Sequence, residues 1–126
     1  MLGKGGEDMI VGKRFKFDAA HYLPDHPTCG QLHGHTWTVD VELEGRLDEN
    51  CIVFDFGKLK EMMNNILKNF DHHNLNDFLG RPTCEIIATY IGTSLKTHLE
   101  EMVPKSAKFY SIKVQEGDGG WAIYKP

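Results

Sequence analysis

Residues 35–44, HTWTVDVELE, decide the fold, because apolar and polar side chains alternate along them without a break. Trp37, Val39, Val41 and Leu43 share one parity, and the residues between them are polar. This alternation is typical of a β-strand with one buried face and one face in water. We therefore predict a half-buried strand here, and the other elements are interpreted around it.

A second strand is predicted for residues 13–21, KRFKFDAAH, where Phe15, Phe17 and Ala19 share one parity. A third and a fourth are predicted for KFYSIKVQE and WAIYK, which follow each other across a GDGG turn and indicate a hairpin. All four segments have the length and the turn signals of antiparallel strands.

Two amphipathic helices are predicted between these strand pairs. Asp55 caps a helix that runs to about Phe70, and Pro82-Thr83 begins another that Pro104 ends. The apolar stripes of the two helices are Phe56, Leu59, Met63, Ile66, Leu67 and Phe70, and Ile87, Tyr90, Ile91, Leu95, Leu99 and Met102. The order strand-strand-helix-helix-strand-strand predicts an α+β fold, an antiparallel four-stranded sheet with two helices on one face.

Composition limits the class of protein. The 126 residues suit a single domain, 1–126, in which the Gly-rich residues 1–12 are expected to form a flexible tail. A net charge of -4 argues against a nucleic-acid partner, and no apolar run approaches the roughly 20 residues of a membrane helix. Three cysteines without an apolar leader segment favour reduced thiols and a cytoplasmic location.

Three histidines continue the apolar faces of the first two strands. His21 has the parity of Phe17 and Ala19, while His33 and His35 have the parity of Trp37 if their strand extends back to them. Neutral imidazoles that converge from one face can bind Zn²⁺, and three protein ligands with an open fourth position are typical of catalytic zinc. The alternative for any one of them is a half-buried histidine that is satisfied by hydrogen bonds.

Cys29 precedes the histidine pair in CGQLHGHT, and its chemistry leaves three roles open. As a thiolate it could close the zinc site as a fourth ligand, or it could stay off the metal as a base or nucleophile. It could also be an inert buried thiol. The residue pattern alone does not choose between these roles.

Two further groups are candidates for chemistry. Asp71-His72 has the composition of an acid/base pair, although a histidine there could equally serve the C-terminus of the first helix. Glu116 ends the apolar parity set of Tyr110, Ile112 and Val114, where a glutamate in a solvated turn is the ordinary alternative.

In combination, these residues resemble the 6-pyruvoyltetrahydropterin synthase family, and within it the 6-carboxytetrahydropterin synthase branch of queuosine biosynthesis. The similarity runs from about Phe15 to the end of the chain. The matching residues are His21, Cys29-x-x-x-His33-Gly-His35, Asp55-Phe56, Asp71-His72, Pro82-Thr83-x-Glu85 and Glu116.

The resemblance implies a tunnelling (T) fold whose subunits join their sheets into an oligomeric barrel, a trimer or a homohexamer with active sites between subunits. It implies Zn²⁺ as the cofactor and a small-molecule pterin as the substrate. It further implies these roles: His21, His33 and His35 bind zinc; Cys29, Asp71 and His72 are catalytic; Glu116 binds the pterin.

The implied activity is that of a lyase, which converts 7,8-dihydroneopterin triphosphate to 6-carboxytetrahydropterin and releases acetaldehyde and triphosphate. Two alternatives keep the fold: a pyruvoyl-forming synthase and a lyase that cleaves the dihydroneopterin side chain. A non-enzymatic alternative is a zinc-stabilised binding protein in which Cys29 is the fourth ligand.

Overall fold

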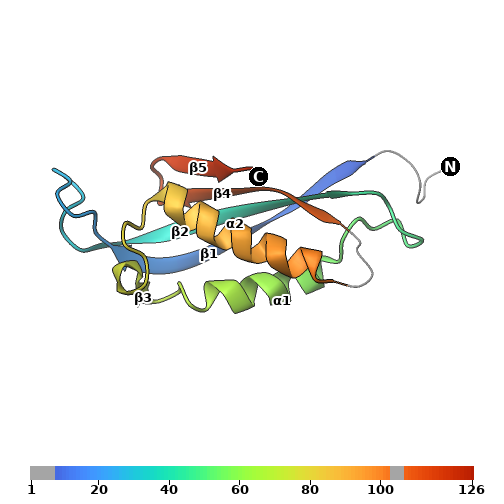
Figure 1. The fold of residues 1–126 in the computed structure, drawn as a ribbon, viewed down its shortest axis with the longest axis horizontal. Helices are drawn as coiled ribbons and strands as arrows, with labels where there is room; N and C mark the ends of the chain where they lie inside the picture. The colour runs from blue at the N-terminus through green and yellow to red at the C-terminus, as the bar shows by residue number, and fades with distance from the viewer. Residues whose placement is uncertain (1–7, 103–106) are drawn as a thin grey trace.

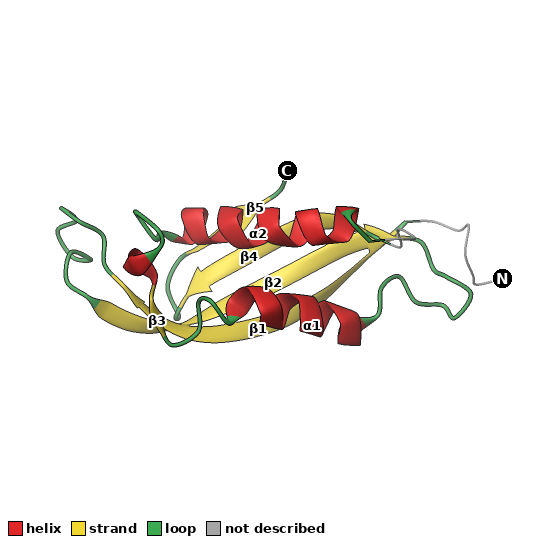
Figure 2. Ribbon diagram, turned by 60° about the horizontal axis from the view of Figure 1, so that its bottom comes forward, coloured by secondary structure: helices red, strands yellow, loops and turns green. Residues whose placement is uncertain are grey.

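The computed structural model describes residues 8–102 and 107–126, which form a five-stranded sheet covered on one face by two helices (Figure 1, Figure 2). None of the described helices has the length and apolar character that crossing a membrane requires. In chain order the elements are β1 (Met9–His21), β2 (His33–Gly45), α1 (Phe56–Leu67), β3 (His73–Asn74), a short 3-10 helix (Leu75–Asp77), α2 (Cys84–Glu100), β4 (Lys108–Glu116) and β5 (Trp121–Tyr124).

The sheet confirms the predicted α+β architecture and adds one strand to it. The strand order is β3-β1-β2-β4-β5, and the β1–β2, β2–β4 and β4–β5 pairs are antiparallel, as predicted. The additional strand β3 has two residues and runs parallel to the end of β1. It forms because the chain that leaves α1 passes beside Ala19 and Ala20, and a two-residue pairing leaves no alternation in the sequence by which to predict it.

The strand β1 is longer than the predicted segment 13–21. It begins at Met9, so residues 9–12 of the expected tail 1–12 belong to the sheet, whereas residues 1–7 lie outside the described part of the chain. Its pairing with β2 is continuous from Met9 opposite Gly45 to His21 opposite His33. The second strand therefore extends back to His33, as the prediction that His33 and His35 share the parity of Trp37 required.

The helix starts follow the predicted caps. The Asp55 side chain accepts a hydrogen bond from the Gly57 N–H, and the Thr83 side chain accepts one from the Ile86 N–H. The helix α1 ends at Leu67, before the predicted limit at Phe70. The predicted stop at Pro104 lies outside the described residues, and α2 already ends at Glu100.

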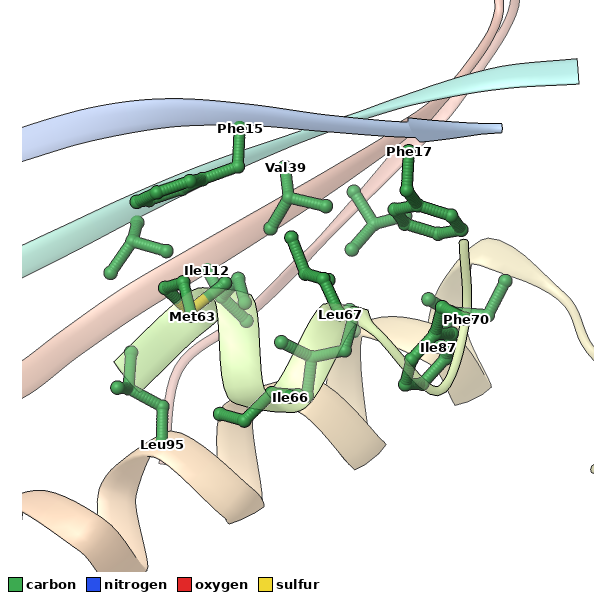
Figure 3. Close-up of a cluster of buried hydrophobic side chains, with 14 of the residues drawn as sticks. Phe15, Phe17, Val39, Met63, Ile66, Leu67, Phe70, Ile87, Leu95 and Ile112 are labelled. Carbon is green, nitrogen blue, oxygen red and sulfur yellow. The ribbon is translucent and has the colours of Figure 1, made fainter. Parts of the chain in front are cut away.

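The core lies between the sheet and the two helices. Phe15, Phe17 and Val39 project from the strands towards Met63 and Leu67 of α1 (Figure 3). Most predicted stripe residues are buried, but Phe56 and Tyr90 are each 45% exposed. Phe56 is the first residue of α1 and lies at the end of the helix, and Tyr90 lies at the edge of its stripe, where the helix surface meets water.

A register shift in the β2–β4 pairing corrects one prediction. Opposite Glu42 and Leu43 the ladder skips a residue, so Phe109 and not Tyr110 takes the inner position and is buried. A bulge of this kind reverses the parity on one side of it. Ile112 and the residues after it keep the predicted parity, so Glu116 remains on the face that also presents the histidines.

Candidate active site

Three imidazoles meet at one end of the β1–β2 hairpin. His21 is directly opposite His33 in the ladder, and Ala19 is opposite His35. The ring centroids are 4.6 Å apart for His21 and His33, 4.7 Å for His33 and His35, and 5.4 Å for His21 and His35. The parity of two adjacent strands is therefore sufficient to bring the three predicted side chains together.

Backbone carbonyls orient two of these rings. His21 Nδ1 lies 2.8 Å from the Pro82 carbonyl oxygen, and His33 Nδ1 lies 2.7 Å from that of Gln31. A carbonyl only accepts, so in the neutral ring Nδ1 carries the proton and Nε2 presents its lone pair. Burial also lowers the pKa of His21, which favours the neutral form that binds metals.

Glu116 completes a group of four potential donors with His21, His33 and His35, whose ligating atoms all lie within 4.8 Å of one another. Its two carboxylate oxygens are 3.2 Å from His21 Nε2 and 3.4 Å from His35 Nε2. Within the described part of the chain, both of these buried nitrogen atoms lack a partner in hydrogen-bond geometry. Buried polar atoms left unsatisfied in this way indicate a missing ion or ligand.

The donor set fits a divalent metal. Three imidazole nitrogens with a carboxylate oxygen are ligands that Zn²⁺ accepts in tetrahedral sites. The carbonyls behind His21 and His33 supply the outer support that such ligands usually have. A site with these donors can bind a metal ion and, with an exchangeable fourth position, present it to a substrate.

Cys29 lies in the loop between β1 and β2, half-buried, and belongs to neither of the two donor groups found among the described residues. Its N–H donates to His26 Nδ1 at 3.0 Å, and its carbonyl accepts from the Leu23 N–H at 2.7 Å. Sequence reasoning gave His26 no role, although a histidine three residues before the cysteine can form this turn. The loop is thus organised around the cysteine.

Asp71 and His72 are in contact, as predicted for a pair, with 2.9 Å between Asp71 Oδ2 and His72 Nδ1. The backbone of Asp18 fixes both residues: its N–H donates to Asp71 Oδ1 at 2.9 Å, and its carbonyl accepts from the His72 N–H at 2.6 Å. The pKa of Asp71 is lowered, first by this N–H and then by His72. The carboxylate therefore stays ionised beside the imidazole.

Asp18 was missed by the sequence analysis. Its carboxylate accepts a hydrogen bond from the Thr36 hydroxyl at 2.5 Å and forms a second group of potential donors with Asp71 and His72. Asp18 has the polar parity of β1, opposite to Ala19 and His21, and that position was the only available signal. Asp18, and with it the Asp71–His72 pair, therefore lies on the side of the hairpin opposite to His21, while His35 and His72 both line one open groove.

Cys84, another residue without a predicted role, supports the turn after Glu116. Its thiol donates to the Gly120 carbonyl at 3.8 Å, and the same carbonyl accepts from the Glu116 N–H at 3.1 Å. Burial first, and then the charge of Glu116, raises the pKa of Cys84 to about 11. The thiol is therefore neutral at physiological pH.

Comparison with known proteins bears on the family and the fold of this chain. Residues 10–126 match the family described as 6-pyruvoyl tetrahydropterin synthase. A protein of Archaeoglobus fulgidus, provisionally named 6-carboxy-5,6,7,8-tetrahydropterin synthase, is 37% identical over 92% of this chain and 95% of its own. The dihydroneopterin monophosphate aldolase of Pyrococcus furiosus is 35% identical over 83% and 87%. The solved structure of Caenorhabditis elegans 6-pyruvoyl tetrahydropterin synthase superposes with a TM-score of 0.83 at 26% identity, covering 100% of this chain and 99% of that one.

Proposed function

Since this chain belongs to the 6-pyruvoyl tetrahydropterin synthase family, we propose that it is a zinc-dependent lyase of the 6-carboxytetrahydropterin synthase type. Its substrate is 7,8-dihydroneopterin triphosphate, which reacts with water to give 6-carboxytetrahydropterin, acetaldehyde and triphosphate. The ring gains the hydrogens that the side chain loses, so the reaction needs no external reductant. In the cell we expect a cytoplasmic enzyme of queuosine biosynthesis.

The observation that supports this proposal most is the convergence of His21, His33 and His35, of which His21 and His35 have buried Nε2 atoms without a hydrogen-bond partner among the described residues. When bound there, zinc supplies a Lewis acid that polarises the side-chain hydroxyls of the substrate. The three residues hold it as neutral imidazoles, and the carbonyls of Pro82 and Gln31 keep the rings in position. We accordingly propose these histidines as the zinc ligands.

Proton transfer is the task of the remaining catalytic residues. We propose that the Cys29 thiol and the Asp71–His72 pair move protons between the side chain and the pterin ring. The ionised Asp71 carboxylate lies 2.9 Å from His72 Nδ1 and holds the imidazole in position for proton transfer. Cys29 works from a loop that His26 organises.

Glu116 is proposed to bind the pterin. The edge of the ring that resembles guanidine presents two parallel N–H groups, and a carboxylate can accept both in a charge-assisted contact. The Glu116 side chain is 29% exposed, so it can be reached from solvent.

The active site is proposed to form between subunits of a trimer or hexamer. Within one chain the three-histidine cluster and the Asp71–His72 pair form two separate donor groups, and a neighbouring copy can bring its own pair to the cluster. The edge strand β5 exposes Trp121 by 58% and Ile123 by 56%, which favours pairing of this edge with another sheet. Light scattering on the purified protein measures the oligomeric state, and an active monomer would exclude shared sites.

A second candidate is cleavage of the dihydroneopterin side chain as an aldolase. The 35% identity to the Pyrococcus furiosus aldolase, over most of both chains, favours it specifically. Such an enzyme breaks a carbon–carbon bond and leaves the ring at the dihydro level. A pyruvoyl-forming synthase, the remaining alternative, reduces the ring without breaking that bond.

Product analysis tests these reactions directly. Zinc-loaded protein is incubated with 7,8-dihydroneopterin triphosphate, and in parallel with the monophosphate, and the products are identified by mass spectrometry. Acetaldehyde with a carboxylated tetrahydropterin is the expected result. A dihydropterin product from the monophosphate would instead favour the aldolase, and a failure of both substrates to react or bind would overturn the pterin assignment.

Replacing Cys29 separates the catalytic role from the structural one. Cys29→Ser is expected to retain zinc and lose turnover, whereas a fourth ligand would lose metal and stability together. Cys51→Ser is the matched control, because Cys51 is exposed and stands in neither donor group of the described residues. Metal loss in Cys29→Ser alone would support the zinc-stabilised binding protein.

A further inference from the structure

We propose that Glu116 has two partners in turn: it is the fourth donor to the metal in the substrate-free protein, and it turns to the pterin when the substrate arrives. The first half concerns metal binding alone, and the second half rests on the proposed function. Together they make ring recognition the event that opens the metal site.

The distances around Glu116 are those of ligands that share one ion. Two ligands at about 2.0–2.1 Å from a tetrahedral zinc lie about 3.3 Å from each other. The carboxylate oxygens of Glu116 are 3.2 Å from His21 Nε2 and 3.4 Å from His35 Nε2. Each separation is close to that ligand–ligand distance. Oε2 faces His21 and Oε1 faces His35, so the carboxylate straddles the point at which the imidazoles converge.

The orientation of the nitrogens supports the same interpretation. Although both contacts are short enough for an ion pair, neither His21 Nε2 nor His35 Nε2 points at Glu116 in hydrogen-bond geometry within the described residues. Donor atoms that aim at a common central point do not aim at one another. An ordinary carboxylate–imidazole pair would satisfy these buried nitrogens directly.

The backbone fixes the base of Glu116 and leaves its side chain free to turn. Its N–H donates to the Gly120 carbonyl, its own carbonyl accepts from the Gly119 N–H at 2.8 Å, and the next N–H, of Gly117, donates to the Thr36 carbonyl at 3.0 Å. Rotation about the side-chain bonds is then sufficient to carry the carboxylate from the histidines to a ligand. No movement of the sheet is required.

Neither nearby cysteine competes for this position. Cys29 is absent from the donor group of the described residues. Cys84 is absent from that group as well, and its thiol donates instead to the Gly120 carbonyl. Glu116 is therefore the residue whose carboxylate closes the site.

This arrangement would make the metal site selective for pterins. A compound with adjacent hydroxyls but without a guanidine-like edge cannot attract the carboxylate away, so it meets a closed site. A pterin has both features, so the Glu116 carboxylate exchanges its contact with the metal for a charge-assisted contact with the ring. Simple polyols should accordingly bind the metal-loaded protein poorly.

Cobalt provides a spectroscopic test that needs no turnover. The wild type, Glu116→Gln and the control Glu61→Gln, which removes an exposed carboxylate from α1, are loaded with Co²⁺. Loss of an outer support residue already weakens metal binding about 10- to 100-fold, so Glu116→Gln should lose at least about tenfold in Co²⁺ affinity. Its visible absorption should also change, while Glu61→Gln matches the wild type in both respects.

Adding 7,8-dihydroneopterin then tests the second half. The absorption of the Co²⁺-loaded wild type should shift as Glu116 departs, and the shift should be absent from Glu116→Gln. Equal Co²⁺ affinity and identical spectra in Glu116→Gln and wild type would overturn the proposal. If the Co²⁺ affinity depends on Glu116 but the protein makes no pterin product, the proposed reaction is wrong, and Glu116 remains a metal ligand.

A measurement on the wild type alone guards against a variant that fails to fold. Water-proton relaxation by the Co²⁺-loaded protein reports whether the metal holds a rapidly exchanging water. A metal held by four protein donors has no exchanging water. Addition of 7,8-dihydroneopterin should change the water-proton relaxation rate. A bound, exchanging water before any ligand is added would overturn the proposal.

Discussion

The two sides of the β1–β2 hairpin each gather polar residues, yet they do so in opposite ways. On the inner side, His21 and His35 present buried nitrogens that find no hydrogen-bond partner in the described structure. On the outer side, Asp18, Asp71 and His72 bind one another and the backbone, and the His72 and Asp71 side chains are 78% and 44% exposed. Both groups contain at least three potential metal ligands.

The burial and the hydrogen bonding of the polar groups distinguish a candidate metal site from a candidate proton-transfer pair. Satisfied groups in water gain little from an ion, whereas buried unsatisfied nitrogens gain a great deal. This contrast supports the proposed roles, a metal site for the inner group and proton transfer for the outer group. Substitutions in each group test the division.

Removing one inner imidazole should have the largest effect. His33→Ala is expected to lower zinc affinity by more than about 100-fold, because it deletes a ligand and not merely an outer support. Turnover should disappear with the metal. Zinc content after dialysis measures the effect, and His98→Ala, on the exposed side of α2, is the control. Unchanged zinc in His33→Ala would contradict the inner site.

The outer pair should affect turnover without affecting the metal. Asp71→Asn is expected to reduce the turnover number about 10²- to 10⁴-fold, the usual contribution of a positioned acid or base, and to leave zinc content unchanged. Asp77→Asn, in the short helix after β3, is the matched control. If Asp71→Asn lost zinc in proportion to turnover, the two groups would have to be one site.

A smaller effect concerns stability in acid. The pKa of Asp71 lies below its ordinary value of 3.8, so its ionised form stabilises the fold above that pH, and this contribution is lost as the pH falls through the lowered pKa. Thermal unfolding across a pH series should show the wild type more stable than Asp71→Asn at neutral pH. The gap should begin to narrow near about pH 4 and close as the pH falls through the lowered pKa. A gap independent of pH would exclude the hydrogen bond from Asp18 as its cause.

The smallest effect is expected at Gly34, between the two metal-site histidines of β2. An added methyl group there meets no atom within 4 Å, and Gly34 opens on the groove that also contains His72. Gly34→Ala should change the free energy of unfolding by less than about 0.5 kcal/mol and leave zinc affinity unchanged. Calorimetry and a zinc titration test this. A loss of zinc would mean that the two faces are not independent.

The features that depend on local sequence, namely the faces of the strands and the starts of the helices, could be predicted. The alternation around Trp37 fixed which face each histidine takes, and the caps Asp55 and Thr83 begin their helices as predicted. Both depend on neighbours a few residues away, which the sequence displays directly.

Contacts between distant segments were not predictable in the same way. The backbone of Asp18 binds Asp71 and His72 from more than fifty positions earlier in the chain, and a backbone contact leaves no mark on residue type. The bulge that turns Tyr110 away from the core depends on how β4 meets β2. For the same reason parity alone placed Glu116 on the correct face without revealing its contacts with the histidines.

The register of the hairpin, His21 opposite His33, has a further consequence for how the chain acquires its structure. A slip of one residue between the strands would turn every side chain of one strand to the other face and separate His21 from His33 and His35. A metal ion at the proposed site would bind only the correct pairing and would stabilise that pairing alone by mass action. Zinc bound there would therefore favour the correct alignment of the strands during folding, before any substrate is present.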